Sequence, residues 1–189
     1  MFMGLVGSEM CIRDRVNIVC CAGEVGSGTT QAAEGKFFSS TVPLGGYGVV
    51  NGEELPAIHK LCNMKSIELV ARSSVNGDLL DEYDDMVEST TRKALVENPH
   101  RVVVVHSVAG SKTGLCVPSP VVAEKLKSEF GDRIISVLDA CQMRSGPSLI
   151  PRWLNEMGPV LMTSSKFYGG PSFGCLLYTS DAADERLRV

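Results

Sequence analysis

The sequence predicts an α/β fold with three layers, in which a mostly parallel sheet lies between helices. Short apolar runs alternate along the chain with segments of helical composition, as they do in proteins of this class. Residues 102–105 are four consecutive valines without polar alternation, so both faces of this strand should be covered. With 189 residues, 44% of them hydrophobic, the chain is long enough for one domain with a core of its own.

Apolar, β-branched runs predict five strands, at residues 16–21, 66–71, 101–106, 134–138 and 160–162. Right-handed crossovers bring the carboxyl ends of parallel strands to one edge of the sheet, where such folds bind ligands. We therefore expect residues 26–30, the loop after His106, Asp139 and residues 163–166 to meet at that edge.

Helical composition covers residues 79–97, 119–130 and 147–157. In the second helix Ser119 can cap the start, Pro120 suits the first turn, and Gly131 can close the end. Its predicted core face consists of Val121, Val122, Leu126 and Phe130. The Gly-rich residues 39–52 are predicted to form a loop.

Composition and charge exclude several classes of partner. A net charge of −4 with scattered Lys and Arg offers no basic surface for nucleic acid, and no apolar run reaches the roughly 18 residues that span a bilayer. Glu9 and Arg13 interrupt any signal-peptide core, so we expect a cytoplasmic protein that binds neither nucleic acid nor membrane. The seven cysteines are irregularly spaced, which favours reduced thiols, and no metal-ligand spacing occurs.

The two ends of the chain are predicted to be translated adapter DNA. When residues 10–14 (MCIRD) are encoded as ATG TGT ATA AGA GAC and extended by AG, the reverse complement in a shifted frame encodes CLLYT and the T that begins a serine codon, as in the string CLLYTS at residues 175–180. Such a relation is typical of a transposon-based sequencing adapter flanking one insert. We therefore expect residues 1–15 and 175–189 to be non-native, and residues 16–174 to be a partial domain.

The strongest candidate site combines DACQ at residues 139–142 with TSSKFYGG at residues 163–170. A carboxylate such as Asp139 can keep a pyridine nitrogen protonated, so that the ring acts as an electron sink. Lys166, 27 positions later, can form a Schiff base with an aldehyde, and the hydroxyls of residues 163–165 can donate to a phosphate.

These motifs resemble those of fold-type I pyridoxal-phosphate enzymes, within them the class V aminotransferase and cysteine desulfurase branch. The resemblance implies that Asp139 binds the pyridine nitrogen and Gln142 lies near the ring hydroxyl. It also implies that Thr163 and Ser165 contact the phosphate and that Lys166 carries the cofactor. Ser165 stands where the branch usually has histidine, so an imidazole role is lost at that position.

The resemblance further implies a partial large domain of an aminotransferase or lyase that acts on an amino acid or amine. It does not select the substrate or the reaction. Such enzymes are completed by a C-terminal small domain and by a second subunit of a homodimer. We therefore expect the 189 residues by themselves to be inactive.

The Gly-rich residues 23–30 (GEVGSGTT) allow several interpretations. Ser27, Gly28 and Thr29 could cradle the cofactor phosphate at a helix N-terminus, or the loop could lie over the ring face and bring Glu24 and Ser27 toward substrate. It could also be a turn without a ligand. As a Walker A loop it lacks the phosphate-binding lysine, because Thr29 takes that place. A nucleotide-binding protein with a degenerate P-loop and a non-catalytic α/β module are thus the alternative functions.

Three further residues lie near the expected site. SKTG at residues 111–114 resembles the branch's Ser-Asn-x-x-Gly loop, with Lys112 at the position of the asparagine. His106 could face the cofactor or be a satisfied strand-end histidine. Cys141 could be a reactive thiol or a small buried hydrophobe.

Overall fold

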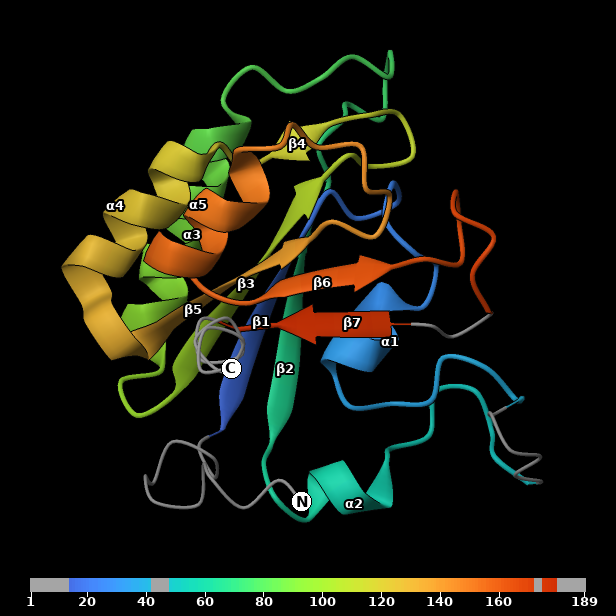
Figure 1. Cartoon of the computed structure of the whole chain (residues 1–189). Coiled ribbons are helices and arrows are strands. Elements are labelled where there is room, and N and C mark those ends of the chain that lie inside the picture. The colour runs from blue at the N-terminus through green and yellow to red at the C-terminus, as the bar shows by residue number, and fades with distance from the viewer. Residues whose placement is uncertain (1–13, 42–47, 172–174, 180–189) are drawn as a thin grey trace, which may run out of the picture.

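The computed structural model describes residues 14–41, 48–171 and 175–179, and these form an α/β fold around one sheet (Figure 1). The sheet order is β2-β1-β3-β5-β6-β7, and β4 pairs with β3 off this path. The parallel strands are β1 (Arg15–Cys20), β2 (Met64–Leu69), β3 (Val102–Ala109), β5 (Ile134–Asp139) and β6 (Val160–Thr163). The antiparallel strands are β4 (Cys116–Val117) and β7 (Cys175–Tyr178). The mostly parallel sheet is as predicted.

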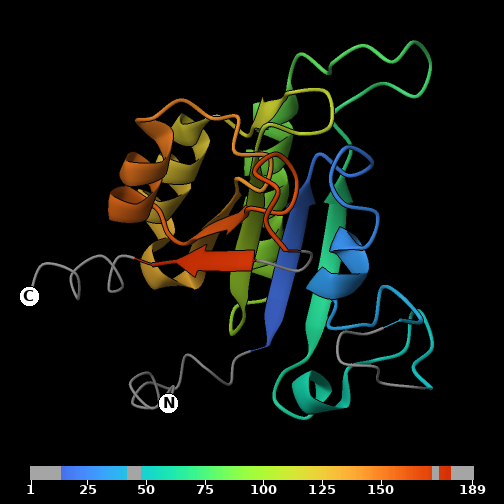
Figure 2. The same cartoon turned by 45° about the vertical axis from the view of Figure 1, so that its right-hand side comes forward.

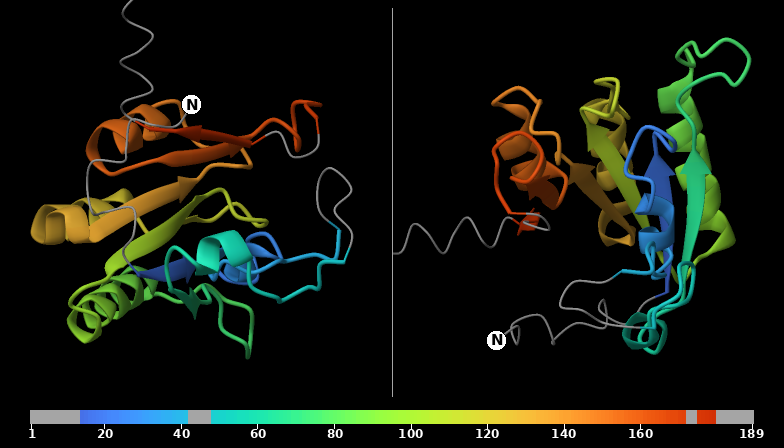
Figure 3. Two further views of the ribbon diagram at one scale, coloured as in Figure 1. Left: turned by 90° about the horizontal axis from the view of Figure 1, so that it is seen from below. Right: turned by 90° about the vertical axis from the view of Figure 1, so that its right-hand side faces the viewer.

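Helices cover both faces of this sheet (Figures 2 and 3). One face carries α3 (Tyr83–Glu97), α4 (Pro120–Phe130) and α5 (Leu149–Glu156), and a short 3₁₀ turn (Gly131–Arg133) follows α4. The short helix α1 (Thr29–Ala33) lies on the opposite face, where Asn17 Nδ2 of β1 donates to Ala33 O at 2.7 Å. The four-residue α2 (Pro56–His59) precedes β2. The predicted three layers are therefore present.

The connections explain why α1 lies apart from the other helices. From β1 the chain moves to β2 on one side, and then returns past β1 to β3 on the other side. With right-handed crossovers, reversing the direction of travel moves the connecting helix to the other face. The reversal creates a topological switch point at the carboxyl ends of β1 and β3, the place where open α/β sheets bind ligands.

The predicted strands and longer helices agree with the structure to within a few residues, with β3 as the main exception. It continues to Ala109, so His106 lies inside the strand. The elements α2, β4 and β7 were not predicted, and a helix beginning near Thr29, as α1 does, was only one of the interpretations of residues 23–30. Residues 28–33 (GTTQAA) are poor in the apolar side chains that would mark a helix, so α1 had no periodic signal.

Strand β7 lies in the segment that the sequence predicts to be adapter-derived. Cys175–Tyr178 pairs antiparallel with β6, with Leu177 opposite Leu161. Most of both predicted adapter segments, residues 1–13 and 180–189, lies outside the described residues. The origin of this segment stays a prediction.

The core is packed between the sheet and the helices. Buried side chains of β1 and β3 pack against α3 and α4, and a second cluster of buried residues centres on Trp153 of α5. In α4 the prediction that Val121 belongs to the core face is wrong, because Val121 is 65% exposed. Val122, Ala123 and Leu126 are buried. Ser119 occupies the N-cap without a side-chain cap bond, and instead its N–H donates to Asp84 Oδ1 at 2.9 Å.

Candidate functional site

Loops from four strands meet at the carboxyl edge of the sheet. Lys112 N donates to Glu24 O at 2.9 Å, which joins the loop after β3 to the loop after β1. Arg144 Nη2 donates to Ser111 O at 3.1 Å, which joins the loop after β5 to the loop after β3. The loops cover residues 21–28, 110–115, 140–148 and 164–171.

Three of the sequence-predicted residues line one small cavity between these loops, of about 60 Å³. Asp139 is the last residue of β5, Gln142 lies in the loop that follows, and Lys166 lies in the loop after β6. Parallel pairing of β5 with β6 brings the ends of both strands to the same edge. The wall is completed mainly by Glu24, Val25, Gly26, Val108, Gly110, Ser111, Lys112 and Cys141.

A larger cavity of about 280 Å³ adjoins the first and lies against α1. Asp139, Val25 and Val108 line both cavities, so the two cavities adjoin at these residues. Thr29 and His106 line only the second. Because its residues come from the ends of β1 and β3 and from α1, this cavity lies at the topological switch point.

The Asp139 carboxylate is held by its own loop. Its Oδ1 accepts the Cys141 backbone N–H at 2.9 Å. Asp139 pairs in register with Val108 of β3, and His106 lies two residues earlier on the same strand face. The half-buried carboxylate is therefore oriented at the edge of the sheet, with an imidazole on the same face.

His106 is neutral and is linked to α1 through two successive hydrogen bonds, with Asn17 between them. Because Asn17 Nδ2 donates to Ala33 O, Asn17 Oδ1 is the acceptor that lies 3.0 Å from His106 Nε2. His106 Nε2 therefore carries the proton and donates. Burial lowers the pKa of His106, and the nearby Asp139 charge only partly opposes this. The two interpretations of His106 are compatible: its ring has a hydrogen-bond partner, Asn17, and His106 also lines the larger cavity.

Glu24 is the most strongly held charge at the site. Its carboxylate accepts hydrogen bonds from Arg72 and Thr113, and from Ser111 Oγ at 2.7 Å. Burial alone would raise the pKa of Glu24, but these hydrogen bonds and the Arg72 charge outweigh it and lower the pKa to about 2. The carboxylate therefore joins the loops after β1, β2 and β3, and it lines the smaller cavity as an anion.

The residues predicted to bind phosphate are more dispersed. The hydroxyls of Thr163 and Ser165 lie 2.8 Å apart. Ser27 is exposed, and Gly28 is packed so closely that a Cβ there would lie 2.5 Å from Cβ of Phe38. Of the five residues predicted to bind phosphate, only Thr29 is among the residues that line the two cavities.

Two arginines at the site were missed by the sequence analysis. Arg72 follows β2 and binds Glu24, which lies 48 positions earlier, so no local pattern indicates the pair. Arg144 lies two residues after Gln142, and its Nη2 donates to Gln142 Oε1 at 3.2 Å. Its guanidinium carbon lies 5.5 Å from the centroid of the Phe167 ring. Its place in the loop after Asp139 was a signal that sequence reasoning could have used.

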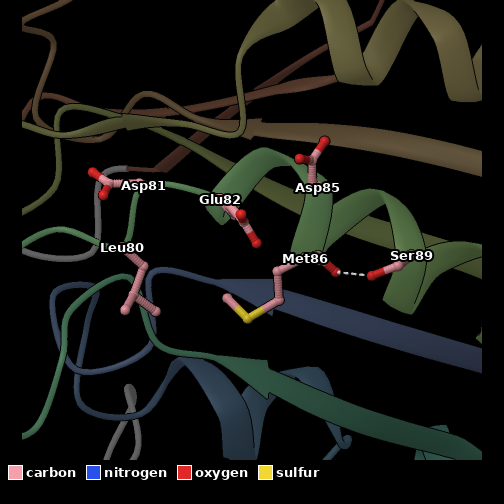
Figure 4. A pocket seen from close by; sticks show the side chains of 6 residues that line it. All are labelled: Leu80, Asp81, Glu82, Asp85, Met86 and Ser89. Atoms are coloured by element: carbon pink, nitrogen blue, oxygen red, sulfur yellow. Dashed lines mark hydrogen bonds between the residues drawn. The ribbon is translucent and has the colours of Figure 1, made fainter.

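A more open hollow of about 610 Å³ lies at the start of α3 (Figure 4). Its side chains include the apolar Leu80 and Met86 and three carboxylates, those of Asp81, Glu82 and Asp85. None of the sequence-predicted site residues lines it. Three carboxylates would repel a phosphate group, which argues against this hollow as the site of a phosphorylated cofactor.

Within residues 14–41, 48–171 and 175–179, no group of three or more His, Cys, Asp or Glu side chains is arranged to hold a metal ion. In the same residues no helix has the length and apolar character that crossing a bilayer requires.

Comparisons with known proteins give structural likeness only. No protein-family model and no curated protein sequence matches the chain. Solved structures with some likeness include sphingosine-1-phosphate lyase from Burkholderia pseudomallei (14% identity, TM-score 0.48, covering 93% of this chain and 33% of that one). A second is Rhodiola rosea 4-hydroxyphenylacetaldehyde synthase (15% identity, TM-score 0.48, covering 97% of this chain and 34% of that one). A third is mouse CSAD (12% identity, TM-score 0.45, covering 87% of this chain and 29% of that one). The chain spans about a third of the length of each.

Proposed function

We propose that this chain is part of the cofactor-binding domain of a pyridoxal-phosphate-dependent enzyme that acts on an amino acid or amine. The observation that carries the proposal is the shared cavity of Asp139, Gln142 and Lys166. These residues come from the end of β5 and from the loops after β5 and β6. The carboxylate suits a pyridine nitrogen, the amide suits a ring hydroxyl, and the primary amine suits an aldehyde.

The surroundings of Asp139 suit this cofactor in two respects. Val25 and Val108 line both cavities and Leu161 lines the larger one, so apolar surface lies beside the carboxylate, as the faces of an aromatic ring need. His106 is neutral, and so adds no positive charge that would compete with a pyridinium for Asp139. When bound, pyridoxal phosphate supplies an electron sink that stabilises negative charge at the substrate carbon next to nitrogen.

Each residue has a defined part in this proposal. The Asp139 carboxylate would accept a hydrogen bond from the ring nitrogen and so favour its protonated form. The Lys166 amine would hold the aldehyde by condensing with it and releasing water, and the same amine, once free, would move a proton at the substrate. Gln142 would donate to the ring hydroxyl. Thr29 faces the larger cavity, and Ser27, Gly28, Thr163 and Ser165 are proposed to reach the phosphate from the surrounding loops.

The same proposal includes three finer points: that the parent enzyme is an aminotransferase or a lyase, that it forms a homodimer, and that it is cytoplasmic. The reaction type and the homodimer rest on the class V-like motifs DACQ and TSSKFYGG, and the cytoplasmic location rests on Glu9 and Arg13, which interrupt any signal-peptide core. Both reaction types use the same carboxylate and lysine, so these residues support the cofactor rather than one reaction.

The direct test is to trap the lysine. The 189-residue chain is incubated with pyridoxal phosphate, reduced with borohydride, digested, and analysed by mass spectrometry. We expect a yellow complex and a pyridoxyl group on Lys166, which is lost in Lys166→Ala and weakened in Asp139→Asn. Lys93→Ala, which changes an exposed lysine of α3, is the control and should retain the label.

Lys112 makes the result specific, because it lines the same cavity as Lys166. Label on Lys112, or label spread over surface lysines, would contradict the proposal. ATP-dependent thermal stabilisation of a chain that stays colourless would favour the P-loop alternative instead. Absence of both effects would favour the non-catalytic module.

A further inference from the structure

Arg144 connects three parts of the candidate site and lies in neither of the motifs DACQ and TSSKFYGG. Its Nη2 donates to Ser111 O at 3.1 Å and to Gln142 Oε1 at 3.2 Å. Its guanidinium carbon also lies 5.5 Å from the centroid of the Phe167 ring. The loops after β3, β5 and β6 thus all contact one side chain.

The bond to Gln142 sets the direction of an amide. A glutamine amide offers one oxygen acceptor and one NH₂ donor, and either can face a ligand. Because Arg144 can only donate, it binds the oxygen and leaves the NH₂ group of Gln142 for a ligand oxygen. Gln142 lines the same cavity as Lys166, so this choice decides what the cavity offers.

The contact with Phe167 acts on the neighbouring lysine. Phe167 is 61% exposed, so burial alone holds its ring weakly. A guanidinium over the ring adds a cation–π attraction. Since Lys166 is the adjacent residue, fixing the Phe167 ring also restricts the backbone that carries the amine.

We propose that Arg144 is a positioning residue: it orients the Gln142 amide as a donor and holds the Lys166 loop against the loop after β5. This inference rests on the proposed function, since it concerns the same cavity. Arg144 acts through Gln142 and Phe167 and need not touch the ligand. A planar guanidinium can bond and stack at once, so lysine should replace it only in part.

The experiment compares three variants with the unchanged chain. Arg144→Met removes the donors and the charge, Arg144→Lys keeps the charge, and Arg152→Met is the matched control. Arg152 is an exposed arginine of α5 that pairs with Glu124 and Glu156, and it lines neither cavity at the site. Circular dichroism first establishes that each variant is folded, and Arg144→Lys carries the test should Arg144→Met unfold.

The first readout is the pyridoxal phosphate concentration that half-saturates borohydride-trapped label on Lys166. We expect Arg144→Met to raise it about tenfold, the size of effect that follows from losing hydrogen bonds to a charged donor. Arg144→Lys should fall between Arg144→Met and the unchanged chain, and Arg152→Met should not differ from the latter. Equal half-saturation in Arg144→Met and Arg152→Met would overturn the inference.

The second readout needs no cofactor. Amide hydrogen exchange of peptides that cover residues 164–170 should be faster in Arg144→Met than in Arg152→Met. Phe167→Leu should produce the same increase, and adding it to Arg144→Met should change little more, because both remove one contact. Unchanged exchange in both variants would count against a positioning role.

The two readouts separate the inference from the proposal on which it rests. If the unchanged chain never acquires label on Lys166, the proposed function fails, while hydrogen exchange still reports whether Arg144 holds the loop. If label forms normally and neither readout responds to Arg144→Met, the function stands and the role of Arg144 is refuted.

Discussion

At the scale of single residues, Glu24 shows how a half-buried charge can organise a sheet edge. Its side chain is 14% exposed, and its carboxylate is bound by Arg72, Ser111 and Thr113 from two other loops. A carboxylate removed from water is costly unless such partners replace the lost hydration. The low pKa of Glu24 indicates that here the partners more than compensate.

Glu24→Gln should therefore lower the free energy of unfolding at pH 7 by about 1–3 kcal/mol, because the amide keeps the shape but loses the charge-assisted bonds. The folded-state pKa of about 2 lies below the ordinary value of 4.5. The extra stability is thus complete above pH 4.5, and is lost as the pH falls toward 2. Urea unfolding of both chains between pH 7 and pH 3 measures this.

The matching control is Glu156→Gln, since the Glu156 side chain is 54% exposed in its pair with Arg152. Exposed pairs of this kind contribute little. A Glu24→Gln effect no larger than that of Glu156→Gln, or one that grows as the pH falls, would contradict the assignment.

At the scale of elements, α4 shows which face of a helix the sheet selects. Leu126 is 1% exposed, whereas Val121 of the same helix is 65% exposed. Both residues are apolar and suit the sequence pattern, but they lie on different faces once α4 packs against β5.

Leu126→Ala should cost about 2–5 kcal/mol of unfolding free energy, the range found for large-to-small changes in a core. Val121→Ala should change it by less than about 0.5 kcal/mol, as surface substitutions usually do. Chemical denaturation of the two variants measures the difference. Similar losses in both would mean that α4 faces the sheet differently.

Tyr83 fixes the start of α3 through hydrogen bonds to two neighbouring loops. Tyr83 accepts the Cys21 N–H at 2.6 Å and donates its hydroxyl to Leu69 O at 3.0 Å. Burial raises the pKa of Tyr83 far above its ordinary range, so the hydroxyl keeps the proton that it donates. One side chain of α3 thus joins the ends of β1 and β2, next to the loop that carries Glu24.

At the scale of the whole molecule, the sheet protects β1 from solvent. Cys20 has no exposed surface, and burial raises the pKa of its thiol to about 12, against the opposing effect of a hydrogen bond with Tyr83. Cys116 of β4 is exposed. Because the thiolate is the reactive form, global folding should control the reactivity of Cys20.

Treatment of the native chain with an alkylating reagent at pH 8 should modify Cys116 rapidly and leave Cys20 unmodified, as followed by peptide mass spectrometry. In urea, the modification of Cys20 should follow the unfolding transition seen by circular dichroism. Cys116→Ser removes the fast site and serves as the control. Rapid modification of Cys20 in the native chain would show that β1 is not central to a stable sheet.

The sequence alone determined the α/β class, most strands and longer helices, and three residues that meet in one cavity, Asp139, Gln142 and Lys166. These follow from local patterns: apolar runs set the strands, and residues placed just after parallel strands share an edge. Only the tertiary structure decided the position of α1, the exposure of Val121, and the partners of Glu24 and Gln142. The partners of Glu24 depend on which distant loops meet, as Arg72 meets Glu24 across 48 positions, and no local pattern records such a meeting. The position of α1, the exposure of Val121 and the orientation of Gln142 toward Arg144 depend on how neighbouring segments pack, which spacing alone does not set.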